Sequence, residues 1–398
     1  MKIAIVHDWL TGMRGGEKCL EIFCELFPSA DIFTLVHIPE KVTDTINRMN
    51  IKTSFIQNLP FAKTKYRNYL PLFPIAVESF DMRGYDIVLS SSHCVAKGVL
   101  TSPETYHICY CYTPMRYAWD MYHEYFSHER LGTVSKFTVP FFMNRIRVWD
   151  EASSRRVDDF VAISKHVATR IKHYYRRESS VIYPPVDTDF YTPMPETMSQ
   201  DKNFYLIISA LTYYKRIDIA IKAFNELKLP LVIIGSGPEE KRLKALAKSN
   251  ITFLGWQPDN ILREYYAMCK GFIFPGKEDF GITPLEAQSC GKGVIAYAEG
   301  GVLETVKHGL NGVLFREQNP RSLIEAVRTF EKMRFDKDKI RQNALTFNKQ
   351  RFKKEIKDAI MNKYTTYWNG RGQAPPLQCG NRENVGAGLA PARQRRNG

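Results

Sequence analysis

The sequence has few cysteines for its length, and none of them form the spacing of a metal or redox motif. Eight cysteines are scattered over 398 residues, and no C-x2-C pair occurs. This absence argues against a structural zinc site and against thiol redox chemistry. We therefore expect reduced cysteines that lie mostly in the core, and neither a metal ion nor another cofactor.

Long apolar runs are also missing. No stretch approaches the roughly 18 apolar residues that a membrane-spanning helix requires. The N-terminal stretch MKIAIVHDW has one lysine and five apolar residues before His7, so it lacks the core and the cleavage site of a signal peptide. We expect a cytoplasmic protein.

Negative charge is scarce relative to positive charge. The net charge is +14, of which +4 lies in the tail from Arg371 to Gly398, leaving +10 for the body. A basic balance suits nucleic acid, anionic lipid or phosphorylated substrates, or simply a soluble basic protein. The charge is spread, with +4 over residues 1–186 and +6 over 187–370, and this even spread argues against nucleic acid.

Apolar runs alternate with helical patterns in both halves of the chain. In the first half the strand-like runs are residues 2–6, 31–36, 85–90, 107–112 and 160–164. A proline-rich stretch at 183–203 indicates a linker, and a second alternation begins at 204. This order predicts an α/β fold with two doubly wound Rossmann-like domains that face each other across a cleft. Such sheets bind ligands at the carboxyl ends of their strands, so the cleft is the expected binding site.

The predicted boundaries are 1–186 and 187–349 for the two domains. A helix over 350–370 is expected to return to the first domain. Residues 371–398 have little apolar content and many Gly, Pro and Arg residues, which predicts a disordered tail.

The stretch GKEDFGITPLEAQSCGKGV at 276–294 predicts a helix start after a buried strand. Thr283 suits the N-cap, Pro284 the first helical position and Glu286 the third, which would complete a capping box. Gly291 suits the C-terminal cap. The glycine-bearing turn Phe280-Gly281-Ile282 would then aim the positive helix end at the cleft, where an anion binds.

Two carboxylates flank this anion site. Glu278 precedes the helix, and Glu286 lies about one turn inside it. They cannot hold a phosphate themselves, so we expect them to accept hydrogen bonds from hydroxyl groups. A nucleotide sugar, with sugars on both sides of a diphosphate, has that shape. For Glu286 the capping role is the competing interpretation.

The E-x7-E spacing from Glu278 to Glu286 resembles the signature of glycosyltransferase family 4, whose members are retaining enzymes of the two-domain GT-B fold. The supporting motifs are GGEK at 15–18, YPPVDTDFY at 183–191, YYKRID at 213–218, GSGPE at 235–239 and GG at 300–301. The resemblance covers about residues 1–368. The segments YCYTPMRYAWD and YKRID are most similar to mannosyltransferases of polysaccharide assembly.

The resemblance implies roles in the second domain, which would bind the nucleotide sugar. Glu286 would bind the donor ribose, and Glu278 would lie near the transferred sugar or its leaving oxygen. Lys215 would neutralise the diphosphate, with Arg216 as a second cation because the usual arginine position is Ala210 here. The backbone expected to meet the sugar and the phosphates is Phe280, Gly281, Ile282 and Thr283.

The first domain would lie on the acceptor side. The resemblance places the Gly15-Gly16 loop over the donor phosphates or at the acceptor, with Glu17 beside it. Asp8 would receive the acceptor proton or cap the following loop. Tyr112 takes the place of a histidine that is catalytic in many relatives, and its carbonyl is expected to retain part of that role. The possible substitutes for the missing imidazole are His7, His93 and His107.

Two segments interleave aromatic and basic residues, 61–80 and 137–150. They suit an anionic membrane surface or a lipid-linked acceptor, or else pack as helices with their charges outward.

Together with the resemblance, the sequence predicts a retaining, metal-independent hexosyltransferase that moves mannose from GDP-mannose to a lipid-linked glycan precursor. The alternatives are a UDP-sugar-dependent transferase, a nucleotide-sugar epimerase of similar fold, and a catalytically impaired adaptor that binds nucleotide or membrane.

Overall fold

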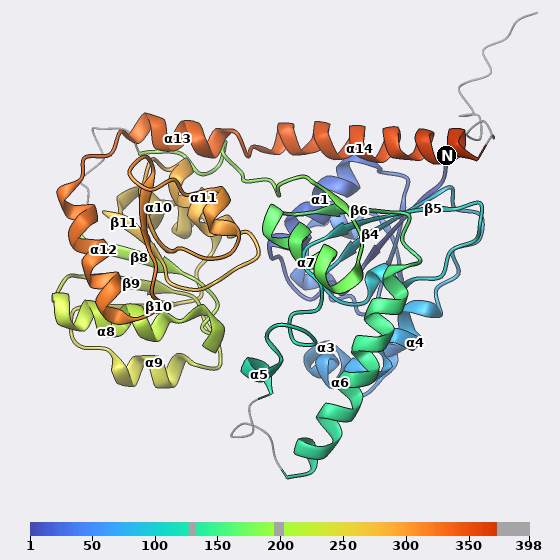
Figure 1. Cartoon of the computed structure of the whole chain (residues 1–398), viewed down its shortest axis with the longest axis horizontal. Helices are drawn as coiled ribbons and strands as arrows, with labels where there is room; N and C mark the ends of the chain where they lie inside the picture. The colour runs from blue at the N-terminus through green and yellow to red at the C-terminus, as the bar shows by residue number, and fades with distance from the viewer. Residues whose placement is uncertain (127–132, 195–202, 372–398) are drawn as a thin grey trace, which may run out of the picture.

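The computed structural model describes residues 1–126, 133–194 and 203–371 (Figure 1). Within them the strands form two parallel sheets. The first sheet has the order β3-β2-β1-β4-β5-β6-β7 and the second the order β10-β9-β8-β11-β12-β13. Their strands lie within 3–181 and 205–315. The predicted α/β fold with two doubly wound units is confirmed.

The first unit carries the seven-stranded sheet. Its described strands are β1 (Ile3–His7), β2 (Asp31–Thr34), β3 (Asn50–Thr53), β4 (Ile87–Ser92), β5 (Tyr106–Cys111), β6 (Asp159–Ala162) and β7 (Ser179–Val181). Its described α-helices are α1 (Gly15–Leu26), α2 (Asp44–Asn47), α3 (Ala62–Lys65), α4 (Phe73–Glu78), α5 (Tyr122–Tyr125), α6 (Thr133–Ser154) and α7 (Lys165–Tyr175). Shorter 3-10 turns include η3 (Tyr66–Leu72) and η4 (Ala96–Gly98).

The second unit carries the six-stranded sheet. Its described strands are β8 (Tyr205–Ile208), β9 (Leu231–Ile234), β10 (Ile251–Gly255), β11 (Gly271–Phe274), β12 (Val294–Tyr297) and β13 (Gly312–Phe315). Its described helices are α8 (Ile217–Leu227), α9 (Glu240–Leu246), α10 (Asp259–Met268), α11 (Ile282–Ser289), α12 (Pro320–Lys332) and α13 (Lys337–Leu345), with the 3-10 turns η5 (Tyr213–Lys215) and η6 (Gly301–Glu304).

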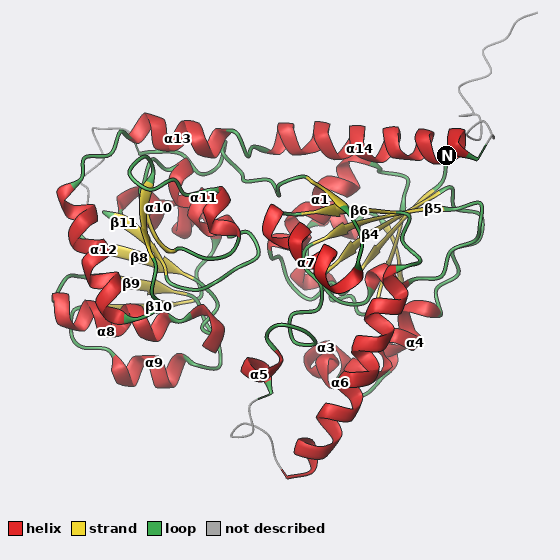
Figure 2. Cartoon of the chain, viewed as in Figure 1, coloured by secondary structure: helices red, strands yellow, loops and turns green. Residues whose placement is uncertain are grey.

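The central strands are apolar because helices cover both faces of each sheet (Figure 2). Every residue of β1, β4 and β5 is buried. Parallel sheets covered in this way are built from near-continuous apolar runs, and these runs are what made the strands visible in the sequence. The helices are amphipathic instead: α8 buries Ile217, Ile221 and Phe224 at helical spacing.

Helix α14 (Lys349–Gly370) continues from the second unit along the first (Figure 1). Its buried residues, Phe352, Ile356, Ile360, Tyr364 and Trp368, share a core with α1 and β5. Phe352 packs 5.9 Å from Phe23 and 5.6 Å from Tyr110, measured between ring centroids. The helix therefore ties the end of the described chain to the N-terminal sheet.

The predicted disordered tail lies outside the described residues, apart from Arg371. None of the described helices combines the length and the apolar character needed to cross a membrane. The seven cysteines among the described residues are buried and form no disulfide with one another.

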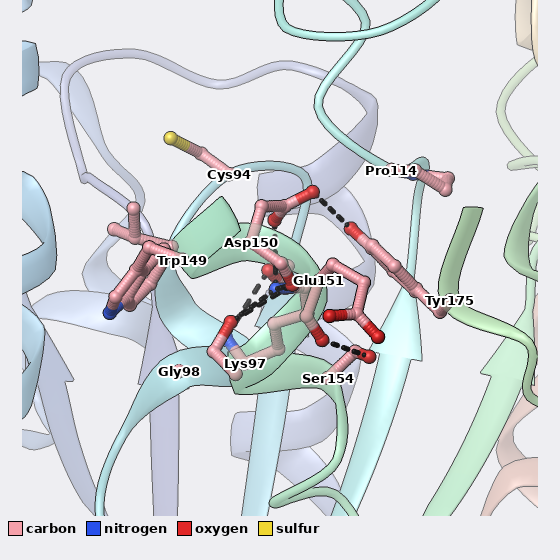
Figure 3. Close-up of polar contacts among 12 residues, drawn as sticks. Cys94, Lys97, Gly98, Pro114, Trp149, Asp150, Glu151, Ser154 and Tyr175 are labelled. Atoms are coloured by element: carbon pink, nitrogen blue, oxygen red, sulfur yellow. Dashed lines mark hydrogen bonds and ion pairs between the residues drawn. The ribbon is translucent and has the colours of Figure 1, made fainter. Parts of the chain in front are cut away.

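A buried ion pair fixes the long helix α6 to the N-terminal sheet (Figure 3). Lys97, on η4 after β4, lies 2.8 Å from the Asp150 carboxylate of α6, and both side chains are almost fully buried. The Lys97 ammonium also donates to Ser153 Oγ at 2.7 Å. The second Asp150 oxygen accepts from Trp119 and from Tyr175 of α7. The ion pair and its hydrogen bonds thus offset the cost of removing both side chains from water.

We expect Lys97→Met to lower the free energy of unfolding by about 3–5 kcal/mol, because it leaves a buried carboxylate without its partner. Urea unfolding would measure the loss. The double variant Lys97→Met/Asp150→Asn should recover part of it, since no charge is then buried. Lys172→Met, which breaks the exposed Lys172–Glu178 pair, is the control and should change stability by less than about 1 kcal/mol. Equal losses in both single variants would contradict this account.

Candidate functional site

A cleft of about 720 Å³ lies between the two units. Its walls come from the segments that follow the carboxyl ends of strands: His93 after β4, Tyr112 after β5, Ser209 and Ala210 after β8, and the stretch 278–283 after β11. Ligands of doubly wound sheets bind at this edge. The sequence-predicted site residues that line the cleft are Gly15, Gly16, Glu17, Tyr112, Lys215, Glu278, Phe280, Gly281, Ile282 and Thr283.

The start of α11 differs from the sequence prediction. The helix begins at Ile282 with Gly281 as its N-cap, so Thr283 is not the cap and Glu286 is not in the position of a capping box. The predicted capping box is therefore wrong. Gly281 has φ +87°, a left-handed conformation that glycine adopts without strain, and it allows the helix to begin two residues early. Gly291, with φ +73°, follows the C-cap as predicted.

The helix start leaves backbone donors facing the cleft. The first N–H groups of a helix have no intrahelical acceptor, and the N-terminus carries partial positive charge. In α11 no side chain caps them, and Ile282 and Thr283 line the cleft. This arrangement favours a bound anion.

Two glycines hold the loop before α11 in place. A Cβ on Gly300 would lie 2.3 Å from the carbonyl oxygen of Glu278, and one on Gly301 would lie 2.2 Å from that of Asp279. The Gly301 N–H donates to the Glu278 carbonyl at 2.8 Å. The GG motif at 300–301 therefore supports the loop from behind and lies outside the cleft lining.

Lys215 and Glu278 form a direct ion pair at the cleft wall. Lys215 ends η5 after β8, whereas Glu278 belongs to the loop after β11, and these two strands are neighbours in the sheet. Their side chains are 17% and 16% exposed, so solvent and a ligand can reach both. The ammonium could bind a diphosphate while the carboxylate accepts a hydrogen bond from a sugar hydroxyl.

The N-terminus of α1 faces α11 across the cleft. A Cβ on Gly15 would come within 2.9 Å of Ile282 Cδ1, so Gly15 lies directly against the first turn of the opposing helix. Two positive helix ends thus border the same space. The Tyr112 hydroxyl donates to the Gly16 carbonyl at 2.9 Å and thereby holds this turn of α1.

A chain of hydrogen bonds runs beneath that turn. Because the Tyr112 hydroxyl donates to Gly16, it accepts from Ser91 Oγ at 2.9 Å, and Ser91 in turn accepts from His7 Nδ1 at 3.0 Å. His7 Nε2 then lies 3.9 Å from Glu17 Oε1. Burial opposes ionisation of the Glu17 carboxyl, but its contacts with His7 outweigh burial and lower its pKa. Tyr112 is thus placed to position the loop, whatever it contributes to chemistry.

Asp8 lies below the cleft and does not line it. Its two carboxylate oxygens accept from four successive backbone N–H groups, those of residues 93–96, at 2.7 to 3.0 Å. His93 Nδ1 lies 2.9 Å from the same carboxylate, and the His93 ring lines the cleft. Burial alone would raise the pKa of Asp8, but the His93 interactions lower it to about 2. Asp8 therefore caps the loop and orients His93.

Asp279, which sequence reasoning missed, joins the two units. Its carboxylate accepts from Arg116 Nε at 2.6 Å and from Arg170 Nη1 at 2.8 Å, and all three side chains are largely buried. Ser164 donates to the Asp279 carbonyl at 2.6 Å. Burial opposes the Asp279 charge, but the two arginines outweigh it and lower its pKa. No sequence signal marks this contact, because its partners lie more than a hundred residues apart.

A second acidic group reinforces the junction. Glu304 of η6 accepts from the backbone N–H groups of Lys165 and His166 at 2.9 and 3.0 Å. These are the first residues of α7, so Glu304 caps that helix from the other unit and complements its positive end.

Glu286 and Arg216 do not line the cleft. Glu286 is buried, accepts from Tyr266 at 2.8 Å and lies 3.5 Å from Lys18 of α1. Arg216 lies 3.3 Å from Asp218 and 3.1 Å from Gln318. The candidate histidine His107 is fully buried against Ser90, and burial lowers its pKa to about 3.

The far end of the cleft is aromatic and lies wholly in the first unit. It is bordered by Trp9, Leu70, Phe73, Tyr117 and Phe126, with Arg67 beside them. These residues follow β1, belong to η3 and α4, or lie in the loop after β5. Sequence patterns gave no sign that these segments converge.

Residues 194–347 match the family model described as "Glycosyl transferases group 1". This part of the chain is therefore similar to the glycosyl transferases group 1 family. The predicted resemblance to glycosyltransferases is thereby confirmed, while membership of family 4 stays a prediction.

The chain is similar in sequence to known glycosyltransferases. O-antigen chain mannosyltransferase C of Escherichia coli is 28% identical over 173 residues, which is 41% of this chain and 47% of that protein. A GDP-mannose-dependent alpha-(1-6)-phosphatidylinositol monomannoside mannosyltransferase of Mycolicibacterium smegmatis is 30% identical over 157 residues, 33% of this chain and 41% of that protein. The chain thus spans less than half the length of these relatives.

The fold is shared over a longer span. The crystal structure of Anabaena Alr3699/HepE in complex with UDP-glucose superposes with a TM-score of 0.65 at 18% identity, covering 91% of this chain and all of that one. The predicted two-domain GT-B fold is confirmed.

We expect Asp8→Asn to lower the free energy of unfolding by about 2 kcal/mol at pH 7, given a carboxyl whose pKa falls from about 3.8 to about 2 on folding. A carboxyl whose pKa is lower in the folded state stabilises that state at any pH above its unfolded pKa. This stabilisation is lost as the pH falls through the pKa of the folded state. The difference between variant and wild type should therefore narrow between about pH 4 and pH 2 in urea unfolding.

The exposed residue Asp358 offers a matched control, and Asp358→Asn should produce only a small difference at each pH. If the difference in unfolding free energy between Asp8→Asn and wild type stays constant down to pH 2, the loss of stability comes from the shape of the amide and not from the lost charge.

Proposed function

We propose that the chain is a retaining glycosyltransferase that moves a hexose from a nucleoside diphosphate sugar to a glycan acceptor. The observation that carries this proposal is the Lys215–Glu278 pair at a cleft bordered by the N-termini of α1 and α11. Cations and helix ends stabilise a departing diphosphate, and a carboxylate receives sugar hydroxyls. The reaction in this proposal uses no cofactor, and groups of the chain instead of a metal ion neutralise the diphosphate.

The proposed step is a substitution at the anomeric carbon. The bond from this carbon to the β-phosphate oxygen breaks, and a bond to the acceptor oxygen forms on the same face. The acceptor proton passes to the departing phosphate oxygen, so no protein base is needed. Lys215 and the backbone donors at Ile282 and Thr283 stabilise the charge that develops on the diphosphate. When the donor binds, the ion pair between Lys215 and Glu278 breaks, and Glu278 accepts a hydrogen bond from a hydroxyl of the transferred sugar.

We further propose mannose as the sugar and GDP-mannose as the donor. Support comes from the mannosyltransferase names of two relatives, one of which is GDP-mannose-dependent. A UDP-sugar donor is the second candidate, favoured by the UDP-glucose complex of a protein with the same fold. A catalytically impaired nucleotide- or membrane-binding adaptor is the remaining alternative, because Tyr112 and Ala210 stand where the resemblance to family 4 implies a histidine and an arginine. The nucleotide-sugar epimerase, the other alternative from the sequence, differs from a transferase because it would act on its substrate without a glycan acceptor.

A lipid-linked acceptor and a position on the cytoplasmic face of a membrane complete the proposal. The segments 61–80 and 137–150 each bury one face, with Phe73 and Val77 on α4 and Met143 and Ile146 on α6. Both also expose large apolar residues. We call the exposed set the aromatic-basic surface; it comprises Phe61, Ile75, Phe141, Phe142, Val148, Lys63, Lys65 and Arg145.

The aromatic-basic surface lies on neighbouring elements. Trp149 of α6 donates to Glu78 of α4 at 2.8 Å, so these two helices are in contact. Cations lie over the exposed rings, with Lys65 5.6 Å from the Phe61 centroid and Arg145 4.6 Å from that of Phe141. Exposed aromatics beside lysine and arginine suit an anionic lipid interface. The packed interpretation of these segments applies to the buried face, and in this proposal the membrane interpretation applies to the exposed face.

The nucleotide site is tested by calorimetric titration with GDP, UDP and ADP. We expect GDP to bind most tightly, and Lys215→Ala to weaken binding about tenfold to hundredfold, because a charge-assisted contact to the diphosphate is lost. Lys222→Ala, an exposed lysine on α8, serves as the control and should bind like wild type. Turnover of GDP-mannose with a lipid-linked acceptor would then be measured.

Preference for UDP would favour the second candidate donor. If none of the three nucleotides binds, the proposed enzymatic function is contradicted and the adaptor alternative is favoured. Glu286→Ala separates binding from structure: weaker nucleotide binding in a folded variant supports a ribose contact, whereas loss of fold assigns Glu286 to the Tyr266 and Lys18 contacts alone.

Vesicle flotation tests the aromatic-basic surface. The protein should float with vesicles of mixed phosphatidylglycerol and phosphatidylcholine but not with phosphatidylcholine alone, and added salt should weaken binding. Replacing Phe61, Phe141 and Phe142 by serine should abolish flotation. Leu310→Ser, at an exposed apolar position of the second unit, is the control. Equal flotation of the triple variant and wild type would show that the membrane contact is not made here.

A further inference from the structure

The second unit alone supplies too little positive charge for a diphosphate. A nucleoside diphosphate carries about three negative charges near pH 7, since the second ionisation of a terminal phosphate lies near pH 6. Among the described residues that line the cleft, Lys215 is the one lysine or arginine of that unit. It is also partnered by Glu278. Ala210 lines the cleft next to it without a charge, and Arg216 lies outside the lining.

The first unit lines the same cleft with three arginines, Arg14, Arg67 and Arg116. Arg116 is engaged, because its Nε and Nη2 both lie within 2.6 Å of the Asp279 carboxylate. Arg67 belongs to η3 at the aromatic end, with its guanidinium 5.0 Å from the Tyr66 ring centroid. Arg14 is the remaining arginine of the cleft lining.

Arg14 directly precedes one of the contacts between the two units. It is the N-cap residue of α1, and the next residue, Gly15, lies against Ile282 of α11. The Arg14 side chain is exposed and forms no ion pair with any residue that the structure describes. It is therefore available to a ligand that enters between the two helix ends.

The backbone at Arg14 is held in place from two sides. Its N–H donates to Glu17 Oε2 at 3.1 Å, and the Tyr112 hydroxyl donates to the carbonyl of Gly16 at 2.9 Å. Glu17 is itself buried. A preorganised backbone lowers the entropy lost when a side chain engages its ligand. This gives Glu17 and Tyr112 a positioning role for the Arg14 loop.

We propose that Arg14 is the second cation of the diphosphate site, supplied from the first unit in place of the residue that is alanine at position 210. The inference rests on the proposed function. It makes donor binding a property of both units together: the diphosphate lies between Lys215 on one side and Arg14 on the other. Arginine suits this role because its planar fork can donate two hydrogen bonds to one phosphate.

The test compares nucleotide affinities by calorimetry. Arg14→Ala should weaken binding of both GDP and UDP by about tenfold to hundredfold, the size of a lost charge-assisted contact, and should leave the much weaker binding of guanosine unchanged. Arg321→Ala, at a 90% exposed arginine of α12, is the matched control and should bind GDP like wild type. The loss on Arg14→Ala should grow as ionic strength falls.

A relocated arginine provides the stronger test. The double variant Arg14→Ala/Ala210→Arg should regain most of the lost GDP affinity, because it returns a cation to the other wall of the same site. A merely structural role of Arg14 would not be rescued in this way.

Wild-type GDP affinity in Arg14→Ala, or a loss that Ala210→Arg does not repair, would overturn the proposal. If Arg216→Ala shows the loss instead, Arg216 is the second cation. If neither wild type nor Lys215→Ala binds any nucleoside diphosphate, the proposed function fails with it. If Lys215→Ala loses affinity and Arg14→Ala does not, the proposed function stands and this inference alone fails.

Discussion

The ion cluster around Asp279 is the constraint on which the site depends. A single carboxylate in the loop of one unit is held by Arg116 and Arg170 of the other, and Ser164 binds the carbonyl of the same residue. Buried charges persist only when they are paired and hydrogen-bonded, and separating the two units would remove both arginines from Asp279. Glu278 and Phe280 flank Asp279 in the chain. The contact that joins the units therefore also sets the position of the loop that lines the cleft.

Electrostatics around the cleft follow from that placement. Two helix ends, one from each unit, meet where Gly15 lies against Ile282, and both contribute partial positive charge. Without a side chain at Gly15 the helices can approach closely enough for both to act on one anion. The acidic groups nearby are either buried in pairs or, like Glu278, matched by a cation. The open space is thus bordered by positive groups, as a diphosphate requires.

Much of the fold was readable from the sequence because its central strands are buried on both faces and appear as apolar runs. The edge strands of the first sheet were not readable. β3 is Asn50–Thr53 and β7 is Ser179–Val181, and both are short, polar and partly exposed. The helix start was misplaced by two residues, because Thr-Pro favours a cap at Thr283, whereas the left-handed Gly281 begins the helix at Ile282. The glutamate spacing did identify the loop, but the pairing of Arg116 with Asp279 depends on tertiary contacts alone.

The passage of the chain between the two units has a mechanical consequence. The outward and return crossings are bonded to each other, with the Val186 N–H donating to the Phe347 carbonyl at 2.9 Å. Together they form one hinge line instead of two independent tethers. Phe280 packs against Tyr183 and Phe347, with ring centroids 5.6 and 5.9 Å away, so the loop that lines the cleft rests beside this hinge. Displacement in a rotation grows with distance from the axis. If the two units rotate about this line, the loop beside it would move less than the rim of the cleft.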